Sequence, residues 1–350
     1  PLLACLNDRM DLETFRALLA DEGQQVLAAL QADDPVGEAA TVAGLLREHP
    51  AALVSAAREQ VRLRRRAAAK YGEYAARLYF TPDSVELSSH LAVSEYKLDR
   101  VLHEVGVVLI DAMCLGSGAD ALVLGWSHHT DAVDADPLTV EIARANLPGM
   151  HDPNLYPTCE DVTEFDSRGE AVFIDLMRRD GPDGVPDAET YDPPLSWALD
   201  RVRTTGYGWV RLAPGLPGQV PPAGLAGADE VEWISHEGRI QEAVVWFGLD
   251  VQRTPSPVPV RRATVLPSGA SLMERRNLSA PDVRPIGRYL YVPDPAVVHA
   301  RLVGELAREV AGGLVEGGGS LLTSDELHRT PFAAVYEVGD ALPLDGTRIP

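Results

Sequence analysis

Cysteine is scarce in this 350-residue chain, and the three cysteines, Cys5, Cys114 and Cys159, lie far apart. No pair of them has metal-ligand spacing, and an odd, sparse set does not build a disulfide framework. We therefore expect no metal ion and a reducing compartment. The chain also lacks the roughly 18-residue apolar run of a membrane-spanning helix. It opens without the basic and apolar segments of a secretory signal, so a cytoplasmic location is the expectation.

Basic residues are in the minority, with 31 Lys and Arg against 52 Asp and Glu, which gives a net charge of −21. Such an acidic chain disfavours non-specific binding to nucleic acid. Any contact with RNA therefore needs a local cluster of basic side chains. One candidate cluster lies in an expected helix and consists of Arg62, Arg64, Arg65, Arg66 and Lys70. A solvated helix face, balanced by nearby acids, explains the same run.

The first hundred residues show helical spacing and no strand-like alternation. From residue 107 the pattern changes, because short β-branched runs then alternate with helical segments; the strand runs lie at 107–110, 130–133 and 171–174. Asp136 is placed to cap a helix that begins at Pro137. Alternating strands and helices predict an α/β fold with a parallel, Rossmann-like, doubly wound sheet.

Beyond about residue 215 the character of the chain changes again. Short strands, such as 231–234 and 243–247, are separated by turn residues. One amphipathic helix is expected over residues 295–310. This part of the chain is typical of an α+β module.

A glycine-containing turn, Gly116-Ser117-Gly118, follows the first expected strand and opens a helix. Glycine lets the backbone approach a ligand closely, and a helix start offers free N–H groups. The stretch also satisfies the dinucleotide-binding pattern. A tight turn without any ligand fits these residues as well, so the turn alone decides nothing.

Acidic residues follow the next expected strands. Asp134 ends the second strand, 18 positions after Gly116. A carboxylate at that point can accept hydrogen bonds from both ribose hydroxyls of a nucleoside. Asp161 follows a further, short strand between the runs at 130–133 and 171–174, which makes it the third in chain order. Its carboxylate can accept a hydrogen bond from an adenine amino group. Asp175 ends the fourth strand, where it could position a substrate amine. Taken alone, Asp175 is better explained by pairing with Arg178 or Arg179. The NAD alternative requires neither Asp161 nor Asp175, whereas the methyltransferase alternative uses both.

The sequence resembles the bacterial class I S-adenosylmethionine-dependent methyltransferases that carry a C-terminal THUMP-like domain. The resemblance runs from about Arg64 to the C-terminus. Its markers are the strings at 65–67, 70–72, 80–87, 116–122, 132–140, 193–197, 232–235 and 289–296. It implies a helical region over 1–95, a methyltransferase core over 96–214, a ferredoxin-like segment over 215–275 and a THUMP-like domain over 276–350. S-adenosylmethionine is the implied cofactor, and structured RNA is the implied partner.

The resemblance also assigns roles to individual residues. The implied cofactor contacts are Asp111, Gly116, Gly118, Asp120, Asp134 and Asp161, and the implied catalytic residues are Asp175, Arg178 and Arg179. The family's Asp-Pro-Ala-Arg-Arg motif falls on residues 175–179, where Leu176 replaces the proline that would stiffen the turn. Asp111 also lies one position early relative to the glycines, and a one-residue slip in a strand reverses the facing of a side chain.

The sequence is compatible with three functions. The first is a methyltransferase acting on an exocyclic amine or ring nitrogen of an RNA base. The second is a protein that kept the fold, binds S-adenosylmethionine or RNA, and lost catalysis. The third is an NAD(P)-dependent oxidoreductase.

Overall fold

The computed structural model describes residues 10–32, 37–104, 106–116, 118–151, 153–176, 188–215, 218, 222–249, 258–275 and 278–339. The chain forms two compact units, Pro1–Thr205 and Gly206–Pro350, which we call unit 1 and unit 2. None of the helices among the described residues is long and apolar enough to cross a membrane.

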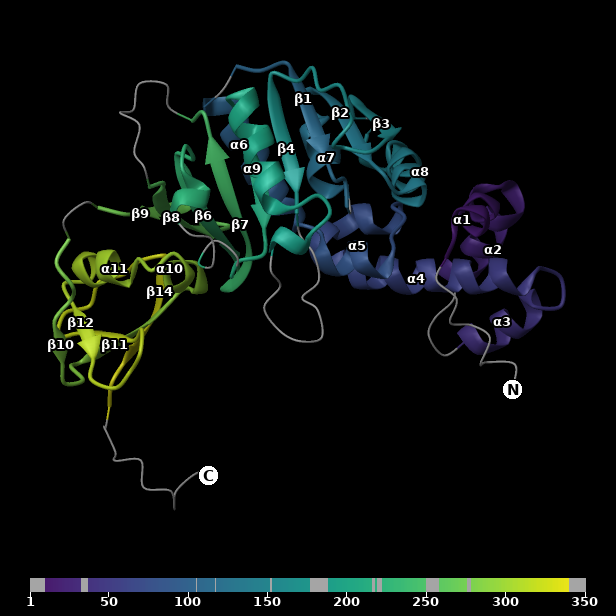
Figure 1. Ribbon diagram of the computed structural model, residues 1–350. Coiled ribbons are helices and arrows are strands. Elements are labelled where there is room, and N and C mark those ends of the chain that lie inside the picture. The colour runs from purple at the N-terminus through teal and green to yellow at the C-terminus, as the bar shows by residue number, and fades with distance from the viewer. Residues whose placement is uncertain are drawn as a thin grey trace. The chain divides into compact units, whose positions relative to one another are not determined.

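Unit 1 begins with a helical region, as the spacing of apolar residues predicts (Figure 1). Asp11 starts the first helix by accepting a hydrogen bond from the Thr14 N–H. Phe15 and Leu18 are fully buried and pack with residues of the next helices, such as Leu30. The helices are α1 (Leu12–Leu19), α2 (Asp21–Gln31), α3 (Glu38–Leu45), α4 (Ala51–Tyr71), α5 (Pro82–Leu87) and α6 (Leu91–Glu104).

The rest of unit 1 is a parallel sheet with helices packed against it. Its strands lie in the order β3-β2-β1-β4, and each described pairing is parallel. The strands are β1 (Leu109–Met113), β2 (His129–Asp134), β3 (Leu155–Cys159) and β4 (Ala171–Asp175), and the helices are α7 (Ala119–Leu124), α8 (Pro137–Asn146) and α9 (Leu195–Thr205). Figure 1 shows β1, β2 and β3 side by side, with α8 next to β3. The predicted parallel α/β arrangement is confirmed.

The predicted start of α8 is also confirmed. The Asp136 carboxylate accepts hydrogen bonds from the N–H groups of Leu138 and Thr139, and Pro137 is the first helical residue. Because all four strands are parallel, their carboxyl ends meet at one edge of the sheet, which is where open α/β sheets bind ligands.

Unit 2 contains the remaining strands in two groups. The first has the order β5-β7-β6-β8-β9, with antiparallel pairs except for β6 and β8, which are parallel. The second is a five-stranded sheet in the order β10-β12-β13-β11-β14. The first group is β5 (Gly208–Leu212), β6 (Glu230–His236), β7 (Arg239–Phe247), β8 (Val260–Leu266) and β9 (Ala270–Met273). The second is β10 (Val283–Arg284), β11 (Tyr289–Pro293), β12 (Gly313–Val315), β13 (Leu322–Ser324) and β14 (Ala333–Glu337).

The single helix expected over 295–310 is wrong. The structure divides it into α10 (Pro295–His299) and α11 (Val303–Glu309). The break falls at Arg301, whose φ of 56° lies in the left-handed region that an α-helix cannot continue through. Buried apolar residues recur three or four positions apart both before the break, at Val297 and Ala300, and after it, at Leu306 and Val310, which explains why the pattern predicted one helix.

Buried charge is a feature of the unit 2 strands that the apolar pattern did not reveal. Arg211 and Glu242 form an ion pair of 2.7 Å between side chains that are both almost fully buried. Glu232, also fully buried, accepts hydrogen bonds from the Trp246 indole and the Thr264 hydroxyl. Each charge thus has a partner within the unit, which a buried charge requires.

The close approach at Gly169 gives a test of the packing in unit 1. A Cβ at this position would lie 2.6 Å from the Ala171 carbonyl oxygen and 2.8 Å from the Asp111 carboxyl carbon. We expect Gly169→Ala to lower the free energy of unfolding by about 1–3 kcal/mol, because the backbone must shift to admit the methyl group. The measurement is urea unfolding followed by circular dichroism.

Gly44→Ala in α3 is the matched control, since a Cβ there meets nothing within 4 Å. Alanine should raise the free energy of unfolding by roughly 0.5–1 kcal/mol at this helical position. Equal effects of the two substitutions would contradict the packing described for Gly169.

Candidate functional site

Gly116 lies between two of the predicted acidic residues at the carboxyl edge of the unit 1 sheet. Its N–H points to the Asp134 carboxylate, with a long N–O distance of 3.4 Å. A Cβ on Gly116 would lie 3.5 Å from Oδ2 of Asp175. The turn after β1 thus brings together the ends of β2 and β4, and the three residues form one rim.

The turn needs its two glycines for their conformation. Gly116 has a φ of 53° and Gly118 a φ of 73°, both in the left-handed region where a side chain is strained. Gly118 also directly precedes the first residue of α7. The backbone at the rim is consequently bare, so a ligand could approach it closely.

Asp134 is the last residue of β2 and is half-buried. Its carboxylate accepts a hydrogen bond of 2.9 Å from the N–H of Asp136, in addition to the long contact with Gly116. Since Asp136 caps α8, Asp134 is not needed for that role and its carboxylate is held beside the glycine turn.

Asp161 follows β3, and the chain at that point is close to Asp134, because the Glu160 N–H donates to the Asp134 carbonyl oxygen. Asp161 is exposed, and its carboxylate accepts hydrogen bonds from the hydroxyl and the N–H of Thr163. These bonds hold the pKa of the Asp161 carboxyl below its usual range. The group is therefore ionised and an acceptor at neutral pH.

Asp175 is the last residue of β4 and only 6% exposed. Leu176, which replaces the expected proline, is fully buried. Its side chain therefore packs inside the protein. Arg178 and Arg179, the other two predicted catalytic residues, lie outside the described residues.

Asp111 is placed away from the rim. It is fully buried in the middle of β1, and its carboxylate accepts a hydrogen bond of 2.9 Å from the Gly169 N–H. Gly169 precedes β4, so this contact lies toward the amino ends of the strands. The one-residue register difference explains the result, and the cofactor contact expected of Asp111 is corrected to a structural one.

Asp120 is likewise engaged by structural partners. Its carboxylate forms an ion pair of 2.8 Å with Lys97 and accepts a hydrogen bond of 2.9 Å from the Ser89 hydroxyl. Lys97 also donates to Ser89, and both Lys97 and Asp120 are almost fully buried. The sequence missed this network because its members come from three segments and Ser89 carries no catalytic signal.

Most of the basic run in α4 has partners within unit 1. Arg64 is buried and donates to the Leu78 carbonyl and to Gln31, and Lys70 donates to the carbonyls of Glu86 and Ser88. Arg62 pairs with Glu59 and Arg65 with Glu38. These contacts favour the structural explanation of the run, and its contact with RNA stays a prediction.

Comparisons with known proteins bear on the chemistry of this rim. A family model described as a domain of unknown function, DUF8688, matches residues 11–67. Two relatives from Mycobacterium tuberculosis, strains CDC 1551 / Oshkosh and ATCC 25618 / H37Rv, are each named as an uncharacterized S-adenosylmethionine-dependent methyltransferase. Each is 29% identical over 305 residues, which are 83% of this chain and 79% of the relative.

A crystal structure of a proposed methyltransferase from Porphyromonas gingivalis W83 has a similar fold. The TM-score is 0.73 at 17% sequence identity, and the match covers 97% of this chain and 85% of that one. At this identity the likeness shows the fold alone.

The buried Lys97–Asp120 ion pair gives a prediction about the stability of the protein next to the glycine turn. Lys97→Met should lower the free energy of unfolding by about 3–5 kcal/mol, because it removes the ion-pair partner at 2.8 Å from the buried Asp120 carboxylate. Chemical denaturation measures this loss. The double variant Lys97→Met with Asp120→Asn should lose less than the single variant, because no charge is then stranded. A double variant that is less stable than Lys97→Met would refute the ion-pair account.

Proposed function

We propose that this chain is an S-adenosylmethionine-dependent methyltransferase whose active site is the rim formed by Gly116, Asp134 and Asp175. The single observation that carries the proposal is the glycine turn held between two carboxylates at the carboxyl edge of a parallel sheet. The enzyme class and the cofactor are those for which the Mycobacterium tuberculosis relatives are named.

The residues at the rim fit an adenosyl group. The left-handed glycines leave the backbone bare, and the Asp134 carboxylate can accept hydrogen bonds from two ribose hydroxyls. Asp161, whose exposed carboxylate is oriented by hydrogen bonds from Thr163, supplies an acceptor for the adenine amino group. When bound, S-adenosylmethionine supplies a methyl group on a positively charged sulfur, from which a nucleophile can take it.

Asp175 is the residue placed to orient that nucleophile. Its carboxylate lies next to the position where a Gly116 side chain would be, and it is almost fully buried. A buried carboxylate can accept a hydrogen bond from a substrate N–H and so direct the nitrogen lone pair. Such a reaction depends mainly on positioning.

The substrate we propose is an amine or ring nitrogen of an RNA base, as the resemblance to THUMP-like methyltransferases implies. Arg178 and Arg179, the residues expected to contact the base or its phosphate, lie outside the described residues. The choice of base is therefore left to the assay below. A protein that binds the cofactor without transferring a methyl group is the alternative, because Leu176 stands where the family has proline.

Asp134→Ala should abolish binding of S-adenosylmethionine while the protein stays folded, because it removes the ribose acceptor. Isothermal titration calorimetry measures the affinity, and NAD titrated in parallel tests the oxidoreductase alternative. Asp136→Ala is the matched control, two positions away on the same loop. It should destabilise the protein by about 1 kcal/mol through loss of the α8 cap, with the affinity unchanged. Unchanged affinity in Asp134→Ala would remove the ribose assignment.

Asp175→Asn should lower the rate of methyl transfer about 100-fold, with the affinity for S-adenosylmethionine retained, because only the orientation of the nucleophile is lost. The assay follows labelled methyl groups into fractionated cellular RNA, protein and metabolites. Label in protein or metabolites alone would overturn the RNA substrate. Tight cofactor binding without transfer to any fraction, restored by Leu176→Pro, would identify the chain as a catalytically impaired form.

A further inference from the structure

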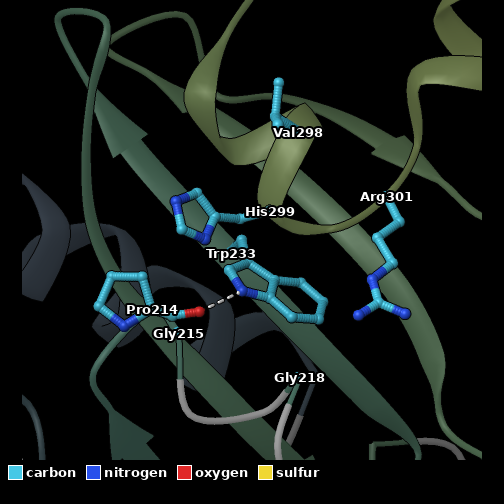
Figure 2. A pocket seen from close by; sticks show the side chains of 7 residues that line it. All are labelled: Pro214, Gly215, Gly218, Trp233, Val298, His299 and Arg301. Atoms are coloured by element: carbon cyan, nitrogen blue, oxygen red, sulfur yellow. Dashed lines mark hydrogen bonds between the residues drawn. The ribbon is translucent and has the colours of Figure 1, made fainter. Parts of the chain in front are cut away.

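Unit 2 contains a hollow of about 250 Å³ that has no part in the methyltransferase rim. It is lined by Pro214, Gly215, Gly218, Trp233, Val298, His299 and Arg301. Figure 2 shows the His299 imidazole and the Arg301 guanidinium on opposite sides of the Trp233 indole, whose N–H donates to the Pro214 carbonyl. The volume is below the range typical of pockets for drug-sized ligands, so a small group fits better than a whole cofactor.

The lining is unusual for so acidic a chain. Among the lining residues none is acidic, although the protein has 52 Asp and Glu. Within the described residues, neither the Arg301 guanidinium nor the His299 imidazole has an intramolecular hydrogen bond or ion pair. Both side chains are exposed. Two donors that have no hydrogen-bond or ion-pair partner in the described part of the chain thus line one hollow.

Hydrogen bonds within the backbone fix the turn from Val297 to Leu302, which carries these two donors. The Arg301 N–H donates to the Val298 carbonyl and the Leu302 N–H donates to the Val297 carbonyl. This is the Schellman pattern that ends a helix, and Arg301 takes its left-handed position, with a φ of 56°. From β8, Arg261 donates to the Ala300 carbonyl at 3.3 Å and pairs with Glu274. The turn that presents His299 and Arg301 is therefore held in place by groups other than their own side chains.

Arginine at this position works against the stability of the turn. Glycine is the residue that the left-handed position favours, because it avoids the steric strain of a Cβ. Backbone strain of this kind persists where the surrounding structure enforces it and is concentrated at ligand sites. Since no hydrogen bond or ion pair of the Arg301 side chain within the described residues offsets the strain, we assign that side chain a contact with a ligand.

We infer that this hollow binds the phosphate group of a nucleotide, either free or within an RNA strand. Arginine offers a planar fork of donors that matches phosphate oxygens, and His299 adds a further N–H on the opposite side. The apolar edges of Trp233, Pro214 and Val298 border the same space and suit the attached sugar or base. All of these residues belong to unit 2, so the site is independent of the proposed methyl transfer.

The test uses the full chain and the substitution Arg301→Gly. Fluorescence anisotropy measures binding of a labelled 10-nucleotide RNA, and calorimetry measures binding of AMP and of inorganic phosphate. Arg301→Gly should weaken binding at least tenfold while the melting temperature stays the same or rises, because glycine relieves the strained turn. A merely structural arginine would give the opposite change in melting temperature.

Arg239→Gln is the control for charge, since Arg239 is exposed on β7 and does not line the hollow. It should leave binding unchanged, and His299→Gln should weaken it. Tighter binding of RNA than of AMP would assign the strand as the source of the phosphate, and the reverse would assign the free nucleotide. The inference is overturned if none of the three probes binds, or if Arg301→Gly binds as tightly as Arg239→Gln.

The affinity for S-adenosylmethionine, measured in the same samples, separates this inference from the proposed function. Arg301→Gly should retain that affinity. Loss of phosphate binding with the cofactor bound normally supports the phosphate site whatever the methyl transfer assay gives. A wild-type chain that binds the phosphate probes but not S-adenosylmethionine would reject the proposed function alone.

Discussion

The parallel register of the unit 1 strands is the constraint on which the candidate site depends. Residues 116, 134, 161 and 175 are far apart in sequence, and each follows or ends a different strand. Because the strands run in the same direction and in register, their ends come to one edge. The contact from Gly116 to Asp134, at 3.4 Å, is too long to hold the rim by itself. The backbone ladders between the strands hold the rim together.

Each unit contains a buried ion pair at a position where apolar residues could have filled the core. Lys97 in α6 pairs with Asp120 in the first turn of α7, directly after the glycine turn, and Arg211 and Glu242 lie in the strands of unit 2. Replacing such pairs by apolar residues is often neutral for stability. Such a pair also restricts geometry, because an ion pair with further hydrogen bonds permits few alternative arrangements of the elements that carry it. The start of α7 is fixed in this way to α6.

Much of the fold could be predicted from the sequence because its signals are local. The runs expected at 130–133 and 171–174 lie within β2 and β4, whereas β1 begins two residues after the start of the run expected at 107–110. The α8 cap requires only Asp136 and Pro137. Likewise, the proximity of Gly116 to Asp134 and Asp175 follows from strand order and direction alone. These features depend on neighbours in sequence or on the general geometry of parallel sheets.

The remaining features depend on contacts that no local pattern encodes. The place of Asp111 depends on register, and the role of Asp120 depends on Lys97 and Ser89 from other segments. The α4 cations were predicted as a surface, yet Arg64 is buried against Leu78 and Gln31. The break at Arg301 was missed because the expected signal for a helix end is glycine.

The contact between Asp111 and Gly169 has a consequence for how this protein can evolve. A Cβ at position 169 would lie 2.6 Å from the Ala171 carbonyl oxygen, 2.8 Å from the Asp111 carboxyl carbon and 2.9 Å from the Asp111 backbone nitrogen. Because two of these three atoms belong to the backbone, a shorter side chain at 111 would not make room for a larger residue at 169. Glycine at 169 should therefore be retained in homologues whatever residue stands at 111.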